Sequence, residues 1–256
     1  MLLAETGSLV ESQGENIAVR TPDAPEYFFG NMLVLPWRPS TRDLKRLEYD
    51  FAQLVGEPPL IAHRTFAWSE SAESTVNLDA FVKQGYIPAV CRVLAAHPDD
   101  IRPIEKNSLI KVRPFDTAED WDAWSRMHLS DMSDPTDSSQ RYIEYQRKAY
   151  TSLINRDLGN WWGAYIEDEQ VGSLGLFFLG GIARFQSVIT APQHRNTGIC
   201  KTLVSEVIRQ IAGRSNRLII VADEAYHAGN IYMAMGFQQQ GRIASLCQEP
   251  LYATTR

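Results

Sequence analysis

The stretch that most constrains the fold of this chain runs over residues 185–211. Its first six residues are mostly aromatic, β-branched or small, which predicts a strand over 185–190. Pro192 ends the strand pairing because proline has no N–H group to donate and a fixed φ. A polar turn follows over 193–198, and apolar residues then recur at helical spacing up to Ile211. The stretch therefore predicts a strand, a tight turn and a long helix.

Such a turn is a candidate anion site. The first N–H groups of the helix point outwards together, and the positive end of the helix dipole adds to their attraction for a phosphate. The turn lacks the lysine of a P-loop and the three glycines of a dinucleotide-binding fingerprint. An ordinary strand–turn–helix connection without a ligand is the alternative that the turn alone leaves open.

The spacing Arg195-x-x-Gly198-x-Cys200 resembles the Q/R-x-x-G-x-G/A loop of the GNAT acyltransferase superfamily. In that family the loop amides hold the diphosphate of acetyl-CoA. Cys200 stands where the family usually has glycine or alanine, which puts the tightness of the last turn in question. The thiol could also be read as a nucleophile, since helix N-termini lower thiol pKa values, but the family transfers the acyl group directly.

A second motif, Tyr232-x-x-x-Gly236-Phe237, resembles the Y-x-x-x-G-F signature that ends the last helix of GNAT domains. The resemblance covers residues 109–246. It implies an α/β (α+β layered) fold, the GNAT acyl-CoA acyltransferase fold, with a mixed central sheet flanked by helices and a smaller GNAT-like α/β unit before it. In that family a tyrosine at the position of Tyr232 lies near the CoA sulfur and protonates the departing thiolate. A core tyrosine with a satisfied hydroxyl is the alternative reading of Tyr232.

The resemblance also implies where acetyl-CoA is held. The end of the strand offers backbone groups to the pantetheine arm and the thioester oxygen, and the loop wraps the diphosphate. The implied cofactor-binding residues are Val188, Ile189, Thr190, Arg195, Asn196, Thr197, Gly198, Ile199 and Cys200.

The base that takes the proton of the amine is less defined by the sequence. A carboxylate commonly does this in the family, often through water, and the segment between the first two helices usually lines the acceptor side. Glu144 is the expected catalytic carboxylate. A solvated acidic loop with helix caps is the competing interpretation. The other candidates are Asp131, Asp134, Asp137, His128 and Gln186.

The first part of the chain echoes the second. Phe81-x-x-x-Gly85-Tyr86 mirrors the motif around Tyr232, but Phe81 lacks the hydroxyl, and residues 1–106 contain no Arg-x-x-Gly turn. We therefore expect a degenerate, non-catalytic GNAT-like domain over 1–106 and a catalytic GNAT domain over 107–256. In the first, strands are expected over 27–35 and 63–68, a helix from about residue 76, and a linker over 97–106.

Composition excludes some partners. The formal net charge of −6 disfavours a grip on nucleic acid or an anionic membrane, and a cationic or neutral amine acceptor fits better. Three scattered cysteines form neither a disulfide framework nor a zinc motif, so no metal is expected. The start of the sequence has no signal-peptide pattern and the apolar run over 171–183 is broken by glycines, so we expect a cytoplasmic protein, a monomer or homodimer.

The sequence thus predicts an acetyl-CoA-dependent N-acetyltransferase that transfers the acetyl group directly to an amine of a small molecule or peptide, with Tyr232 as general acid. A non-catalytic CoA-binding regulatory module is the alternative. A nucleotide-binding α/β domain is disfavoured because the P-loop lysine and the fingerprint glycines are missing.

Overall fold

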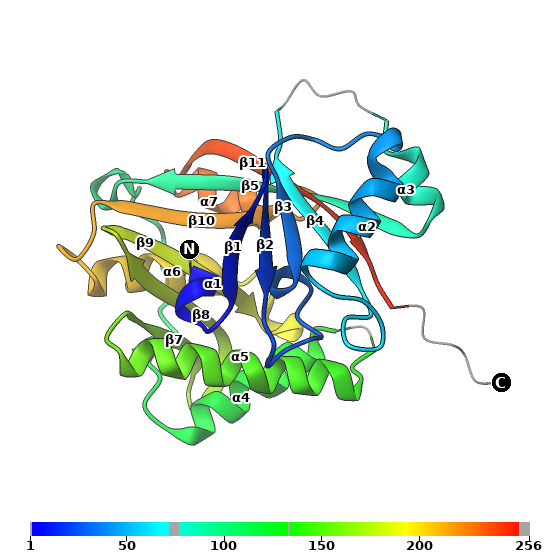
Figure 1. The fold of residues 1–256 in the computed structure, drawn as a ribbon. Coiled ribbons are helices and arrows are strands. Elements are labelled where there is room, and N and C mark those ends of the chain that lie inside the picture. Colours follow the sequence, from blue (N-terminus) through cyan, green and yellow to red (C-terminus); the bar gives the residue numbers. More distant parts are fainter. Residues whose placement is uncertain (1, 72–76, 133, 251–256) are drawn as a thin grey trace. The chain divides into compact units, whose positions relative to one another are not determined.

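The computed structural model describes residues 2–71, 77–132 and 134–250 (Figure 1). They form two compact units. Unit 1 combines Met1–Arg92 with Asp223–Ala225 and Gly241–Arg256, and unit 2 combines Val93–Ala222 with Tyr226–Gln240. Two long strands, β5 (Tyr86–Ala96) and β11 (Gln238–Gln248), contribute to both units. The domain boundary expected after residue 106 divides the chain into two consecutive segments, whereas each compact unit combines several segments. The two expected domains therefore stay a proposal.

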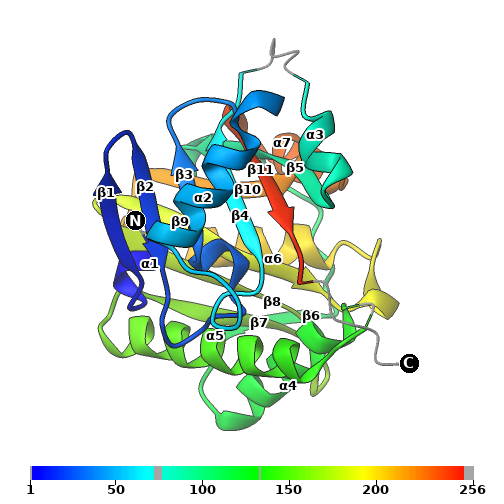
Figure 2. The ribbon, with the colours of Figure 1, turned by 45° about the vertical axis from the view of Figure 1, so that its right-hand side comes forward.

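Unit 1 is a mixed sheet covered by one main helix. Its strand order is β1-β2-β3-β4-β11-β5, with β3 and β4 parallel and the pairs β1–β2, β2–β3 and β4–β11 antiparallel. Figure 2 shows α2 lying across β3 and β4, where Leu47 and Phe51 pack on Phe66 in the core. The elements are α1 (Leu2–Glu5), β1 (Leu9–Gln13), β2 (Asn16–Arg20), β3 (Met32–Leu35), α2 (Leu44–Leu54), β4 (Arg64–Ser69) and α3 (Asp79–Lys83).

The strand predicted over 27–35 is shorter than expected, because only Met32–Leu35 is extended and a 3-10 turn occupies Phe28–Gly30. The side chain of Asn31 explains the difference. Its amide oxygen accepts from the backbone N–H of Thr21 at 2.8 Å, and its amide nitrogen donates to the carbonyl of Ala24 at 2.8 Å. These bonds fold the chain back before the strand begins, which apolar patterning does not reveal. The helix expected from residue 76 starts outside the described residues, and α3 begins at Asp79.

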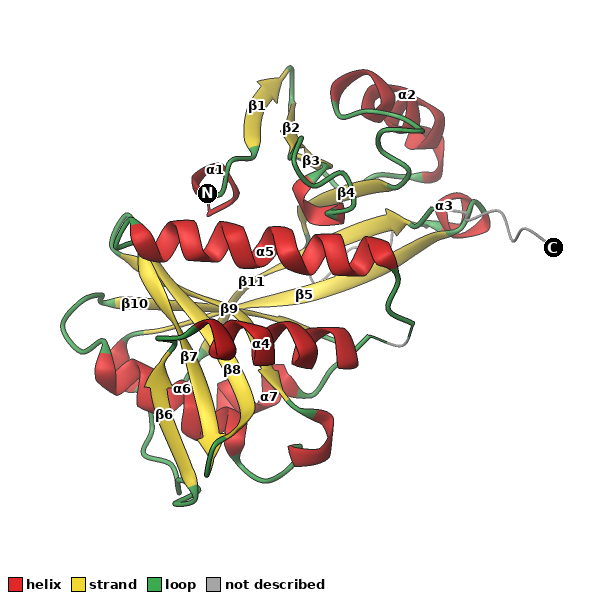
Figure 3. Cartoon of the chain, turned by 90° about the horizontal axis from the view of Figure 1, so that it is seen from below, coloured by secondary structure: helices red, strands yellow, loops and turns green. Residues whose placement is uncertain are grey.

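Unit 2 contains the larger sheet, in the order β5-β10-β9-β8-β7-β6. Helices α4 and α5 lie on one face and α6 and α7 on the other, as Figure 3 shows. Two glycines of β8 mark the two faces. A Cβ on Gly172 would meet Ile199 of α6, and a Cβ on Gly175 would meet Trp161, which contacts α4 and α5 on the other face. The elements are β6 (Ile110–Pro114), α4 (Ala118–Ser130), α5 (Asp137–Asn155), β7 (Gly159–Ile166), β8 (Glu169–Leu179), β9 (Ile182–Thr190), α6 (Ile199–Gln210), β10 (Arg217–Asp223) and α7 (Ala228–Ala234).

This architecture confirms the predicted fold class, a mixed sheet flanked by helices. The segment expected as a linker is packed rather than loose. The backbone N–H of Arg102 donates to the carbonyl of Met235 at 2.9 Å, and Ile101 and Ile104 rest on the core of unit 2. In the part of the chain that the structure describes, no helix combines the length and the apolar character needed to cross a membrane.

Candidate active site

Strands β9 and β10 part after a short parallel contact. Their register pairs Arg217–Ile219 with Ile182–Arg184, and the rest of β9, residues 185–190, pairs only with β8 on its other side. Over that length, half of the backbone N–H and C=O groups of β9 lack a ladder partner in β10. Backbone polar groups require partners, so this open edge can pair with another extended polar chain.

A β-bulge lies in the same part of β9. The register pairs Ser173 with Ile189 and Gly175 with Gln186, so the single residue between them on β8 faces two residues of β9, Ser187 and Val188. Ser187 has φ +43°, an uncommon value for a residue other than glycine. A bulge leaves its extra residue outside the ladder and re-aims the local backbone, and bulges occur often beside active sites.

The predicted turn leads into α6 as expected. Pro192–His194 forms a 3-10 turn, Asn196 has φ +63°, and Gly198 has φ +82° directly before the first helical residue, Ile199. Gly198 offers no side chain to cap the helix, so the first N–H groups of α6 have no side-chain partner there. A Cβ on Gly198 would meet nothing within 4 Å. The glycine is therefore required by its backbone angle, and the space above it is open.

Two side chains from other segments hold this loop. Arg195 forms an ion pair with Asp131, the C-cap residue directly after α4. The Asn107 side chain donates to the carbonyl of Thr197 at 3.0 Å, and its backbone N–H donates to the hydroxyl of Thr202 at 3.0 Å. Asn107 comes directly after the expected linker and belongs to no motif, so nothing in the sequence singled it out.

Tyr232 and Cys200 lie together although they are 32 positions apart in the sequence. The Cys200 thiol contacts the Tyr232 hydroxyl at 4.0 Å, and Tyr232 is only 3% exposed. Burial raises the pKa of Tyr232, and the nearby thiol raises it further, so the phenol keeps its proton at neutral pH. Burial also raises the pKa of the Cys200 thiol to about 11, which makes it a poor nucleophile.

The acidic candidates do not converge on Tyr232. Asp131 is engaged with Arg195, and Asp137 is the first residue of α5. Glu144 lies on the solvent side of α5, where its carboxylate is 2.7 Å from the ammonium of Lys148. No contact in the described residues joins Glu144 to the loop or to Tyr232. Asp134, between the two helices, is exposed.

The other two candidates, His128 and Gln186, lie on the face of the sheet that α4 and α5 cover. Burial lowers the pKa of His128 to about 4, so its ring is neutral at pH 7. In the described part of the protein, His128 Nε2 and Gln186 Nε2 are buried without a hydrogen-bond partner.

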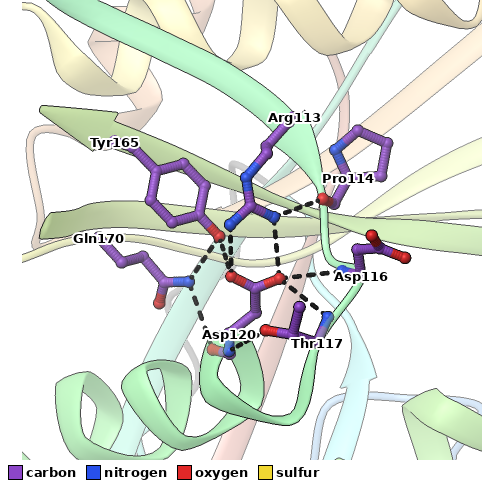
Figure 4. Close-up of polar contacts among 7 residues, drawn as sticks. All are labelled: Arg113, Pro114, Asp116, Thr117, Asp120, Tyr165 and Gln170. Carbon is purple, nitrogen blue, oxygen red and sulfur yellow. Dashed lines mark hydrogen bonds and ion pairs between the residues drawn. The ribbon is translucent and has the colours of Figure 1, made fainter. Parts of the chain in front are cut away.

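A charged network fixes the start of α4 (Figure 4). The Arg113 guanidinium donates two bonds of 2.8 Å to Asp120, and the Tyr165 hydroxyl donates a third at 2.7 Å. Burial alone raises the pKa of Asp120, but these donors and two backbone N–H groups outweigh it and hold the pKa well below its usual range. Burial and the adjacent carboxylate raise the pKa of Tyr165 to about 12.

A polar pocket of about 620 Å³ opens beside this network and reaches Gln193 at the start of the loop. Among the residues that the structure describes, no group of three or more His, Cys, Asp or Glu side chains is arranged to hold a metal ion.

Comparison with known proteins places this geometry in context. Residues 157–239 match the family model of the acetyltransferase (GNAT) domain. A functionally unknown conserved protein from Staphylococcus epidermidis shares the fold with a TM-score of 0.74 at 14% identity, over 94% of this chain and 93% of the other. A GCN5-related N-acetyltransferase from Kribbella flavida gives a TM-score of 0.63 at 14% identity, over 96% and 91% of the two chains.

A tandem GNAT protein from the clavulanic acid biosynthesis pathway gives a TM-score of 0.57 at 11% identity, over 96% of this chain and 85% of the other. No curated protein sequence matches the chain. At these identities the structural likeness shows a shared fold.

In unit 2 the parallel strands β9 and β10 part, and β9 leads into the loop before α6. This arrangement is the fold of acyl-CoA acyltransferases. The match to the acetyltransferase (GNAT) model makes this more specific, because residues 157–239 contain both of the motifs that resemble that family.

Proposed function

We propose that this protein is an acetyl-CoA-dependent N-acetyltransferase with one active site, in unit 2. The observation that carries the proposal is the open edge of β9, which runs directly into the loop before α6. An acyl-CoA has an amide-bearing pantetheine arm that suits an unpaired strand edge, and a diphosphate that suits free helix N–H groups. Val188, Ile189 and Thr190 would pair with the arm. Residues 195–200 would wrap the diphosphate.

The chemistry is a direct transfer. A neutral amine attacks the thioester carbonyl carbon, a C–N bond forms, the C–S bond breaks, and the leaving thiolate takes a proton. Tyr232 is the candidate donor of that proton because its phenol is protonated at neutral pH and its hydroxyl contacts only the weakly bonding Cys200 thiol among the described contacts. The N–H groups freed at the β9 bulge are suited to hydrogen-bond the oxygen that becomes negative.

The proton of the attacking amine needs an acceptor, and Glu144 remains the candidate proposed from the sequence. Its exposed carboxylate, paired with Lys148, favours transfer through water rather than direct contact. Glu144→Gln should then lower the rate most at low pH, where little amine is neutral. A rate profile identical to that of the native protein would remove Glu144 from the mechanism.

The first test combines binding and turnover. A ligand that binds only the folded state stabilises it by mass action, so acetyl-CoA at 100 times its Kd should add about 2.7 kcal/mol and raise the melting temperature. Release of free thiol from acetyl-CoA and a panel of amines measures transfer. No thermal shift at millimolar acetyl-CoA would overturn the proposal. A shift without thiol release for any amine would favour the non-catalytic CoA-binding module instead.

We further propose that residues 1–106 are a degenerate GNAT-like half. Supporting this, Gly85 with φ +85° lies two residues after α3 and directly before β5, and Gly236 with φ +113° lies two residues after α7 and shortly before β11. The buried Phe81 takes the position that corresponds to Tyr232, without a hydroxyl.

A further inference from the structure

The face of the unit 2 sheet beneath α4 and α5 carries an arginine close to the β9 bulge. Arg184 pairs across the ladder with Phe177, and cross-strand partners project to the same face. Phe177 stacks on Tyr150 of α5, with ring centroids 5.7 Å apart. Arg184 therefore projects towards α5, and its charge acts on the Tyr150 hydroxyl. The side chain of Ser187, the bulge residue, also lowers the pKa of that hydroxyl, although burial raises it overall.

This arginine has no counter-charge. Within the residues described, Arg184 makes no ion pair or side-chain hydrogen bond, although it is only partly exposed. The other arginines of unit 2 either have partners, such as Arg113 with Asp120 and Arg147 with Asp122, or are exposed to solvent. A partly buried guanidinium without an anion is costly unless a ligand supplies one.

Unpaired hydrogen-bonding groups continue from Arg184 along the same face. Gln186 pairs with Gly175, whose missing Cβ would meet the ring of Trp161 at 2.5 Å, so the Gln186 side chain lies beside Trp161. Ser173 is two residues from Gly175 on β8 and projects to the same side. Gln186 Nε2 and the fully buried Ser173 hydroxyl have no partner in the described residues. Both groups can donate to an oxygen.

We propose that the acceptor substrate is an amine that also carries a carboxylate, as an amino acid does, and that Arg184 binds this carboxylate. The guanidinium fork matches a carboxylate with two parallel hydrogen bonds, and Gln186, the next residue on the same face of β9, can donate to a remaining lone pair. The position of Arg184 beside the bulge then directs the amine towards the open edge of β9. A polyamine, which the overall acidity would favour, is repelled by this face. This inference rests on the proposed acetyl transfer and names its substrate class.

The experiment compares acceptors that differ only in the carboxylate. The probes are the standard amino acids, their carboxamides and spermidine, each with acetyl-CoA, and acetylated products are identified by mass spectrometry. We expect at least one amino acid to be acetylated with a far lower KM than its carboxamide. Arg184→Gln should raise that KM roughly 10- to 100-fold, as loss of a charged hydrogen-bond partner does, while the KM for acetyl-CoA stays unchanged.

Arg217→Gln is the matched control, because Arg217 is an exposed arginine of the neighbouring strand β10, and it should leave both constants unchanged. Arg184→Lys should restore part of the affinity, since it returns the charge without the fork. The inference fails if no carboxylate-bearing amine is acetylated, if carboxamides or spermidine are used equally well, or if Arg184→Gln leaves the acceptor KM unchanged. The proposed function fails separately, when the native protein shows no thermal shift with acetyl-CoA.

Discussion

Two residues of the candidate site, Gly198 in the loop and Tyr232 in α7, have opposite surroundings: open space around the first and close packing around the second. Gly198 is required by its positive φ, not by crowding, because a Cβ there has free space within the protein. Tyr232 has the reverse character: its surroundings bury it, and its hydroxyl reaches only the Cys200 thiol among the described contacts. A weak sulfur partner leaves most of the bonding capacity of the phenol available, which suits a proton donor better than a satisfied core tyrosine.

Tyr232→Phe should lower turnover by about 10²- to 10⁴-fold, the usual contribution of a positioned acid or base, with nearly unchanged affinity for acetyl-CoA. Steady-state kinetics by thiol release and a calorimetric Kd separate the two effects. A variant as fast as the native protein would show that the thiolate leaves without help from this phenol.

Gly198→Ala should weaken acetyl-CoA binding because a non-glycine residue at φ +82° costs roughly 1–2 kcal/mol and its methyl enters the space above the loop. Gly181→Ala is a matched control, since Gly181 has φ +81° and equally open surroundings in the β8–β9 turn. Both variants should lose similar stability in urea. If they also bind acetyl-CoA equally well, the diphosphate does not lie at Gly198.

Among the elements, α4 depends on the charged network at its first turn. The Asp120 carboxylate caps the helix, pairs with Arg113 and accepts from Tyr165 while only 4% exposed. Asp120→Asn should lower the free energy of unfolding by about 2–3 kcal/mol, because charged hydrogen bonds are each worth about 1.5–3 kcal/mol. In addition, the new amide NH₂ group would face the donors that now bond to the carboxylate, and two donors cannot bond to each other. Asp122→Asn, which loses an exposed pair with Arg147, should cost under about 1 kcal/mol.

The same carboxylate gives a defined pH dependence. The pKa of Asp120 is lowered by folding, so its stabilisation is complete above the unfolded value of about 3.9 and is lost as pH falls below it. The difference between native and Asp120→Asn should therefore shrink below about pH 4. Urea midpoints measured from pH 3 to 7 check this, and a difference that is constant over the range would contradict it.

The sequence predicts the loop and α6 well because both depend on local chemistry: a proline, a glycine and an apolar stripe. Local patterning also places Thr117 before α4, where it caps the helix. It cannot show that Asn31 folds residues 27–31 into a turn, because the partners of Asn31 lie up to ten residues away. Nor does it show the bulge at Ser187 or the unpaired Arg184, since both depend on which strand pairs with β9 and in which register.

At the scale of the whole molecule, each unit contains a histidine whose pKa is strongly lowered in the fold. Burial lowers the pKa of His63 in unit 1 and of His128 in unit 2 to about 4. In the unfolded chain both histidines have pKa values near 6.5, so between about pH 4 and 6.5 the unfolded chain binds protons that the folded protein does not bind. The stability of both units should thus be complete above about pH 6.5 and decrease as pH falls towards 4.

Urea unfolding followed by circular dichroism should show this decrease, and His63→Gln should make it shallower by removing one of the two protons. His227→Gln, at an exposed site, is the control and should leave the slope unchanged. An equal slope in the His63 variant would mean that acid acts through other groups.

The sharing of β5 and β11 has a consequence for how this molecule can be taken apart. Unit 1 needs the last described strand residues of the chain, 241–248, and unit 2 needs 93–96 from before the expected boundary. No single cut of the chain therefore yields a complete unit. A fragment of residues 107–256 lacks residues 93–96 of β5, which belong to unit 2, and contains residues 241–248 of β11, which belong to unit 1.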